Sequence, residues 1–392
     1  EMTRMLLDRR AAQASGGAVA RTVPDTLVDL LTERLDRLSP EGKQLAQVAS
    51  VIGREFDREL LAASLPEEGV ALQAGLQAML DSGLVLQASA DGELLAFKHA
   101  LVEDTAYASL PPKRCAELHG RVADALLTRF ADRVERQPVL AARHLTRAGR
   151  RLQAAPWWQA AGGQALSRGA PREAAGHLRA GLAALQAIPT GTGGLERDAA
   201  ELGLLSMLGP VTMVLLGPGS AEFGAVQERA YNLSQTLPGQ PRLFPTSYGW
   251  CLYNWGRARL DTAKQLVDGL LHAAGERADD TEAVMAANNM AGMVLFHRGN
   301  AEAAQMHLTT STSLYNPERD AALYPFYMMD FGVFGRFYLA LAKHVLGDAA
   351  AARRIAAEAL QLAEGLNQPH TMGFAMLANF NTAVMRGDVD EA

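Results

Sequence analysis

RGNAEAA, residues 298–304, contains a glycine followed five residues later by an alanine, and the same spacing recurs in RGAPREA (168–174), LGDAAAA (346–352) and RGDVDEA (386–392). Glycine permits the tight turn between two antiparallel helices, and a small alanine lets the second helix lie close to the first. A weaker version runs from Ala258 to Ala263, and the later glycines follow it at spacings of 41, 48 and 40 residues. The pattern predicts an irregular array of helical hairpins.

The composition favours helices over strands. Apolar residues make up 48% of the 392 residues and aromatic residues only 6%, a mixture typical of helical proteins. Charged residues make up 20%, so the chain can bury a core rather than remain disordered. The formal net charge of -6 gives no electrostatic footprint for nucleic acid.

The two cysteines, Cys115 and Cys251, imply no disulfide framework and favour a cytoplasmic protein. The most apolar stretch, Val211–Leu216, is far shorter than the roughly 20 residues of a membrane span, and Pro210 is expected to interrupt the helix before it. The sequence therefore predicts neither a membrane span nor a signal peptide. Because the chain begins at Glu1 and ends within a repeat, we expect a piece of a longer protein.

The segment 24–100 is expected to form helices followed by a β-hairpin, the order of a winged helix. Ser39 and Asp57 stand where each can cap the helix that follows it. Two short apolar runs, residues 84–86 and 94–97, flank an Asp-Gly pair, which predicts a hairpin. No other convincing strand pair is visible in the sequence.

The helix expected before this hairpin, Glu67–Ser82, would be the groove reader of a DNA-binding winged helix. It contains no lysine or arginine, and the hairpin itself carries Asp91 and Glu93. Affinity for DNA depends on neutralising phosphates. We therefore expect no direct nucleic-acid binding by this segment.

FKHALVEDTAY (97–107) and RCAELHGRV (114–122) resemble the region that follows the ATPase module in bacterial STAND-type (AAA-like) signalling ATPases, many of which are fused to class III adenylate or guanylate cyclase domains. The resemblance implies a mainly α fold, a winged-helix-like domain followed by an α-solenoid of tetratricopeptide-like helical hairpins. The implied parts are the end of the ATPase lid helix with a linker (1–23), the winged-helix-like domain (24–100), connecting helices (101–155) and tetratricopeptide-like repeats (156–392).

In this family a histidine just after the hairpin can reach bound ADP, and the resemblance implies that role for His99. The sequence departs from the family's Met-His-Asp, since Lys98 and Ala100 flank the histidine. The alternative is that His99 packs against or caps the next helix. The sequence has no phosphate loop, so this chain is expected to hold no cofactor, and ATP or ADP would belong to an upstream ATPase module.

No catalytic constellation or metal motif is visible, so we expect no enzyme activity in the chain itself. Cys115 and His119 have the i, i+4 spacing of a metal pair, but a structural role is the preferred interpretation. The expected function is regulation and protein interaction, with a cyclase or similar output; the alternative is the ligand-sensing repeat region of a transcription activator whose DNA-binding domain lies elsewhere. A protein or small effector would bind the repeats, where aromatic residues form either the core or a groove: Tyr248, Trp250, Tyr253, Trp255, Tyr327, Phe331, Phe334 and Tyr338.

Overall fold

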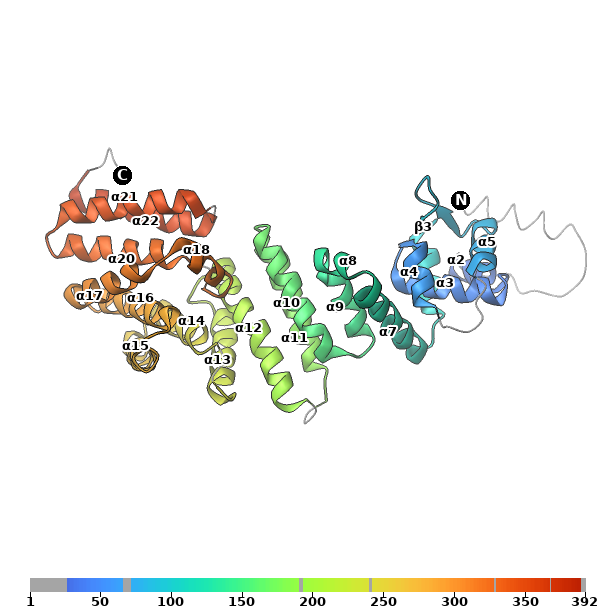
Figure 1. Cartoon of the computed structure of the whole chain (residues 1–392), viewed down its shortest axis with the longest axis horizontal. Coiled ribbons are helices and arrows are strands. Elements are labelled where there is room, and N and C mark those ends of the chain that lie inside the picture. Colours follow the sequence, from blue (N-terminus) through green and yellow to red (C-terminus); the bar gives the residue numbers. More distant parts are fainter. Residues whose placement is uncertain are drawn as a thin grey trace, which may run out of the picture. The chain divides into compact units, whose positions relative to one another are not determined.

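The computed structural model describes residues 27–65, 72–189, 193–239, 242–327, 329–366 and 368–388. The predicted lid helix and linker, residues 1–23, lie outside this part of the chain. The chain divides into two compact units, Glu1–Arg151 and Leu152–Ala392, which we describe separately. Figure 1 shows both as mainly helical.

The first unit combines helices with one small sheet (Figure 1). Its elements are α2 (Leu27–Asp36), α3 (Pro40–Ile52), β1 (Glu55–Asp57), α4 (Arg58–Ser64), α5 (Leu72–Asp81), β2 (Val85–Gln87), β3 (Leu94–Phe97), α6 (Ala100–Ala108), α7 (Pro112–Arg129), α8 (Ala131–Arg136) and α9 (Pro138–Arg147). The segment treated as connecting helices, up to Arg151, packs within this unit.

The predicted helix caps and hairpin are confirmed. Ser39 Oγ accepts a hydrogen bond from the Gly42 amide at 3.1 Å at the start of α3, and Asp57 Oδ1 accepts one from the Leu60 amide at 2.6 Å at the start of α4. β2 and β3 pair antiparallel. The sequence missed β1, which pairs with the other edge of β3 to give the sheet order β1-β3-β2, because three residues are too few to show an alternating pattern.

The second unit is an α-solenoid of antiparallel helices. Its elements are α10 (Arg151–Ser167), α11 (Pro171–Gln186), α12 (Gly194–Leu216), α13 (Ala221–Thr236), α14 (Leu243–Gly256), α15 (Leu260–Gly275), α16 (Thr281–His297), α17 (Ala301–Leu314), α18 (Pro317–Asp320), a 3-10 turn (Ala321–Leu323), α19 (Tyr324–Tyr327), α20 (Phe331–Val345), α21 (Ala349–Leu366) and α22 (Pro369–Arg386).

The glycine and alanine pattern marks the turns of this array, as predicted. Gly169, Gly299, Gly347 and Gly387 all have positive φ angles, between 71° and 89°. In each turn the next amide bonds to the carbonyl five residues earlier, as Asn300 does to Leu295 at 3.0 Å, which is the Schellman arrangement. The corresponding alanines are fully buried: Ala174, Ala304, Ala352 and, in the weaker version of the pattern, Ala263. Ala392, the alanine of the last pair, lies outside the described residues.

The predicted interruption at Pro210 is wrong. α12 continues through Pro210 to Leu216, since a run of buried residues from Leu204 to Met213 lets packing outweigh the lost backbone hydrogen bond. By length and composition α12 is the one helix in the described residues that could cross a membrane, and 61% of its apolar window is buried inside the protein. The helix is thus much longer than the apolar stretch Val211–Leu216 considered in the sequence, and its burial identifies α12 as a core helix in this structure.

Candidate functional site

A polar cavity of about 470 Å³ lies within the first unit, between the end of α3 and the helices α6, α7 and α9. Each helix contributes residues from one face, so the site requires the fold of the whole unit. The lining residues are Ser50, Val51, Ile52, Gly53, Arg54, Glu103, Asp104, Tyr107, His119, Leu140, Arg143, His144 and Arg147.

Tyr107 on α6 is the centre of a hydrogen-bond network at the cavity wall. Its hydroxyl lies 2.9 Å from His119 Nε2 and 3.1 Å from both Cys115 Sγ and Arg147 Nη1. His119 Nδ1 lies 2.9 Å from His144 Nδ1. The network therefore joins α6, α7 and α9 through side chains that are far apart in sequence.

Burial keeps both histidines of the network neutral. Desolvation, followed by the charges of Arg147 and Arg143, lowers the pKa of His119 to about 4. The pKa of His144 is lowered to about 3 by desolvation, then by His119 and the same two arginines. Neutral imidazoles can each donate one hydrogen bond and accept another, which the chain of contacts uses.

The mouth of the cavity carries charges of both signs. Arg54, Arg143 and Arg147 are exposed cations, and Glu103 and Asp104 are the carboxylates. Within the described residues none of the five forms an ion pair. Burial raises the pKa of Glu103, which Asp104 raises further and Arg54 lowers.

Cys115 and His119 come together at the Tyr107 hydroxyl. Cys115 donates to the Tyr107 hydroxyl and His119 contacts the same oxygen. In the part of the chain that the structure describes, no group of three or more potential metal ligands is present.

His99 occupies the N-cap position of α6, and its side chain makes no capping hydrogen bond. It is half-buried and does not line the cavity. The structure therefore places it beside the first turn of α6, and the ADP-sensing role stays a prediction from the resemblance.

The aromatic residues of the repeats divide into two groups. The buried group belongs to the core of the second unit: Tyr248, Tyr327, Phe331, Phe334 and Tyr338. The hydroxyls of the three tyrosines all have partners within the protein, as where Tyr248 donates to Asn289 at 3.0 Å. Burial in the shared core of several repeats leaves little of these five side chains exposed, and the partner-binding role of the repeat aromatics stays a prediction.

The remaining aromatics, Trp250, Tyr253 and Trp255, are half-buried. Trp250 stacks on Tyr253 with ring centroids 5.3 Å apart, and Trp255 lies 5.1 Å from the ring of His297. Of the eight predicted aromatics, these three are more than slightly exposed.

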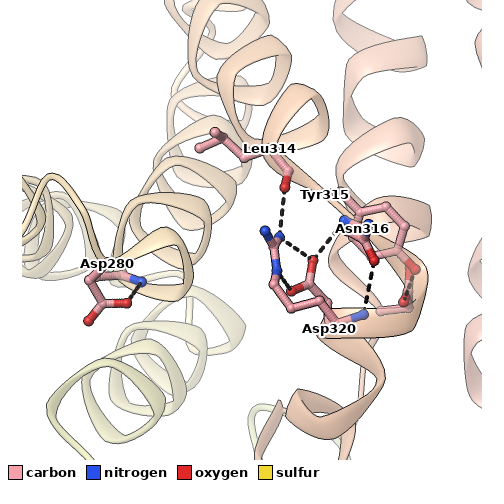
Figure 2. Close-up of polar contacts among 8 residues, drawn as sticks. Asp280, Leu314, Tyr315, Asn316 and Asp320 are labelled. Carbon is pink, nitrogen blue, oxygen red and sulfur yellow. Dashed lines mark hydrogen bonds and ion pairs between the residues drawn. The ribbon is translucent and has the colours of Figure 1, made fainter.

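The insertion between α17 and α20 is a compact turn rather than an open loop. Figure 2 shows Asp320 bonded back to Asn316, whose amide donates to Asp320 Oδ2 at 2.9 Å. Arg319 pairs with Asp320 at 2.6 Å and donates to the Leu314 carbonyl at 2.7 Å. This turn lies within the 48-residue spacing between Gly299 and Gly347, is held by its own side chains, and leads into α19, whose Tyr327 belongs to the core.

The second unit is thus a helical-repeat protein of the α-solenoid class. The chain is 26% identical over 298 residues to an uncharacterized protein of Rhizobium meliloti (strain 1021), covering 74% of this chain and 28% of that protein. This chain therefore spans less than a third of its relative. No family model matches the sequence.

Two solved structures are similar to the chain. One is a Signal Transduction ATPase with Numerous Domains (STAND) protein with a tetratricopeptide repeat sensor from Pyrococcus horikoshii, with a TM-score of 0.41 and 13% identity, covering 93% of this chain and 57% of that one. The other is the apo form of RapI, with a TM-score of 0.43 and 10% identity, covering 71% of this chain and 78% of that one.

The cavity is not evident from the sequence. Its arginines and histidines occur singly among many charged residues, and the four elements that meet there are separated by up to about a hundred positions. The one available signal was the Arg143-His144-x-x-Arg147 cluster on α9, which places two cations on the helix face beside a histidine.

Proposed function

We propose that this chain is a non-catalytic regulatory and protein-interaction segment of a larger signalling ATPase. The observation that carries the proposal is the array of antiparallel hairpins, several of which are closed by recurring glycine turns. Such an array builds an extended surface from many short units, which suits partner binding more than chemistry. A cyclase or similar output domain is the finer part of the proposal and derives from the sequence resemblance.

The proposed contact surface on the repeats is the half-buried aromatic set Trp250, Tyr253 and Trp255. Each ring packs on a neighbour on one side, as Tyr253 does on Phe223 at 6.3 Å. A partly accessible aromatic held by its neighbours loses little conformational freedom on binding, and such residues make strong anchors.

The first unit is proposed to be a winged-helix-like coupling module between the ATPase and the repeats. Its helix order and its sheet order β1-β3-β2 support that interpretation. Within the described residues, α5 carries no lysine or arginine, which supports a coupling role over DNA binding. A cytoplasmic location is part of the proposal, in keeping with the free thiols of Cys115 and Cys251.

The experiment that tests the proposal is to read the complete gene and then assay the parent protein. A phosphate-loop ATPase module encoded before residue 1 is expected, and its absence would refute the proposal. A helix-turn-helix encoded after residue 392 would instead favour the transcription-activator alternative. The isolated chain is expected to hydrolyse no ATP and to form no cyclic nucleotide; either activity in the purified chain would contradict the non-catalytic assignment.

In the parent protein, Trp250→Ala combined with Trp255→Ala is expected to change the ATPase or output activity in the presence of its partner while leaving the basal rate intact. The matched control is Leu195→Ala with Leu216→Ala, two exposed apolar residues at the ends of α12. Equal effects of the two pairs would argue against an aromatic contact surface.

A further inference from the structure

We propose that the cavity of the first unit binds a small molecule bearing an oxyanion, a phosphate or a carboxylate, held by Arg143, Arg147 and His144 of α9. The proposal goes beyond the partner role of the repeats, because it concerns a separate unit and a small ligand. It rests on the direction of the hydrogen-bond network, on the arrangement of charges and on the size of the cavity.

The groups that can only donate determine which atom of the network carries each proton. Arg147 can only donate, and Cys115 donates its thiol proton, so the two together fill the lone pairs of the Tyr107 oxygen. Tyr107 must then donate its own proton to His119 Nε2 at 2.9 Å. The reverse order would bring three donors to one hydroxyl oxygen and leave its proton without an acceptor.

The order continues through the histidine pair. A neutral imidazole that accepts at Nε2 carries its proton on Nδ1, so His119 Nδ1 donates to His144 Nδ1 at 2.9 Å. His144 is therefore protonated on Nε2. That N–H finds no acceptor in the described residues, although His144 is only 7% exposed and lines the cavity. The nitrogen is not one of the buried side-chain atoms that lack a partner in the described residues, so the N–H is open to the cavity, where a ligand oxygen can accept its hydrogen bond.

The charges of the cavity wall are separated into two regions. The charges that act on the two imidazoles are those of Arg143 and Arg147, one helical turn apart on α9. Glu103 instead interacts with Asp104 and Arg54. The α9 side is thus rich in donors and positive, while the α6 side carries the carboxylates.

This separation specifies the class of ligand further. An oxyanion on the α9 side would receive the His144 N–H and charge-assisted hydrogen bonds from two arginines. An amino group or other donor on the ligand would face Glu103 and Asp104. The volume of about 470 Å³ suits a metabolite rather than a single ion. The polar lining suits a small polar metabolite with an anionic and a donor end.

The test is calorimetric titration of the 392-residue chain at pH 7 and low salt with inorganic phosphate, succinate and phosphoethanolamine. Phosphate and succinate distinguish the two kinds of oxyanion, and phosphoethanolamine adds the amino group. We expect one oxyanion class to bind, and phosphoethanolamine to bind more tightly than phosphate. Glu103→Gln is expected to reduce the difference in affinity between phosphoethanolamine and phosphate. The proposal would be overturned if none of the probes bound at concentrations up to about 10 mM, which is above the dissociation constants of even weak specific complexes.

The decisive variant is Arg143→Gln with Arg147→Gln. Losing charge-assisted hydrogen bonds is expected to weaken binding roughly tenfold or more. The control, Arg121→Gln with Arg129→Gln, removes the same charge from exposed positions of α7 outside the cavity and is expected to change affinity less than about threefold. Equal weakening by both pairs would show nonspecific attraction and refute the site.

Two further measurements keep the result interpretable. The single variant Arg143→Gln removes one cation and keeps the hydrogen bond from Arg147 to Tyr107. Arg143 itself forms no hydrogen bond within the described residues, so its loss should not disturb the network. Histidine NMR signals of the wild-type chain should report the ligand at His144 and His119. Binding that leaves both histidine signals unchanged would place the ligand elsewhere and overturn the proposal.

Discussion

Gly292→Ala tests the close packing of the repeat hairpins most directly. Gly292 lies in α16, where a Cβ atom would stand 2.2 Å from Leu308 Cγ and 2.5 Å from Leu308 Cδ2 on α17. Leu308 is fully buried, so its branched end has no free space to enter. The glycine is therefore required by the approach of two helices rather than by a turn.

The expected magnitude is a balance of two effects. Replacing a helical glycine by alanine stabilises a helix by roughly 1 kcal/mol. Overpacking a closed core costs roughly 1–3 kcal/mol, and the contact with the branch point of Leu308 points to the upper part of that range. The net loss of unfolding free energy is then about 1–2 kcal/mol, or a fall in Tm of about 2–8 °C for a unit of this size.

The assay is thermal unfolding together with hydrogen exchange of peptides from α16 and α17. Gly269→Ala is the matched control, because a Cβ there meets no atom within 4 Å inside α15, and it should stabilise by roughly 0.5–1 kcal/mol. Leu308→Ala in the Gly292→Ala background should cost less than Leu308→Ala alone. If Gly292→Ala raised Tm as Gly269→Ala does, the packing argument would be refuted.

Three further predictions concern a turn, pH and DNA. Gly347→Ala should lower the Tm of the repeats, because its φ of 89° costs a side chain roughly 1–2 kcal/mol; an unchanged melting curve would contradict this. Folding lowers the pKa of His119 and His144 from 6.5 to about 4 and about 3, so the unfolded state binds more protons once the pH falls below 6.5. The unfolding free energy of the first unit should therefore fall towards pH 4, by up to about 1.4 kcal/mol per pH unit per histidine, with no dependence from these groups at higher pH. Urea unfolding across this range checks the slope, and a flat profile would disprove buried neutral histidines. Because α5 has no basic residue, an electrophoretic assay at low salt should show no shift of duplex DNA, and a shift would reopen nucleic-acid binding.

Local signals in the sequence predicted much of the fold. Ser39, Asp57 and the hairpin follow from chemistry within a few residues, and the structure confirms each. The failure at Pro210 has a different cause, since the helix is retained by burial against other helices, which no local rule describes. Propensity and capping act locally, whereas tertiary packing can reverse them.

The candidate sites show the same difference between local sequence signals and tertiary packing. The eight aromatics were visible because they cluster in sequence, but their burial depends on which helix faces meet, so five of them proved to be core. The cavity depends wholly on how helices pack. Its residues Tyr107, His119 and His144 are connected through hydrogen bonds between three different helices. Side-chain spacing along one helix would not have brought them together.

The irregular spacing of the repeats also has a structural explanation. The glycine-to-alanine signal is missing at the turn between α12 and α13, since Glu222 stands five residues after Gly217, and Gly217 has φ 86° and ψ 158°. This is not the left-handed helical geometry of the other turns, and Ser220 caps the next helix instead, accepting from the Phe223 amide. A different turn needs no alanine five residues later, so the pattern is absent while the hairpin is present.

The same turn explains why glycine recurs beside it. A Cβ at Gly256 would stand 2.9 Å from the carbonyl carbon of Pro218, and a Cβ at Gly219 would stand 3.0 Å from the Gly256 carbonyl oxygen. Backbone therefore packs directly on backbone where α14 ends against the turn after α12. Because backbone cannot move aside as a side chain can, the two glycines keep neighbouring repeats in contact, and the array continues through Gly217 without a missing unit.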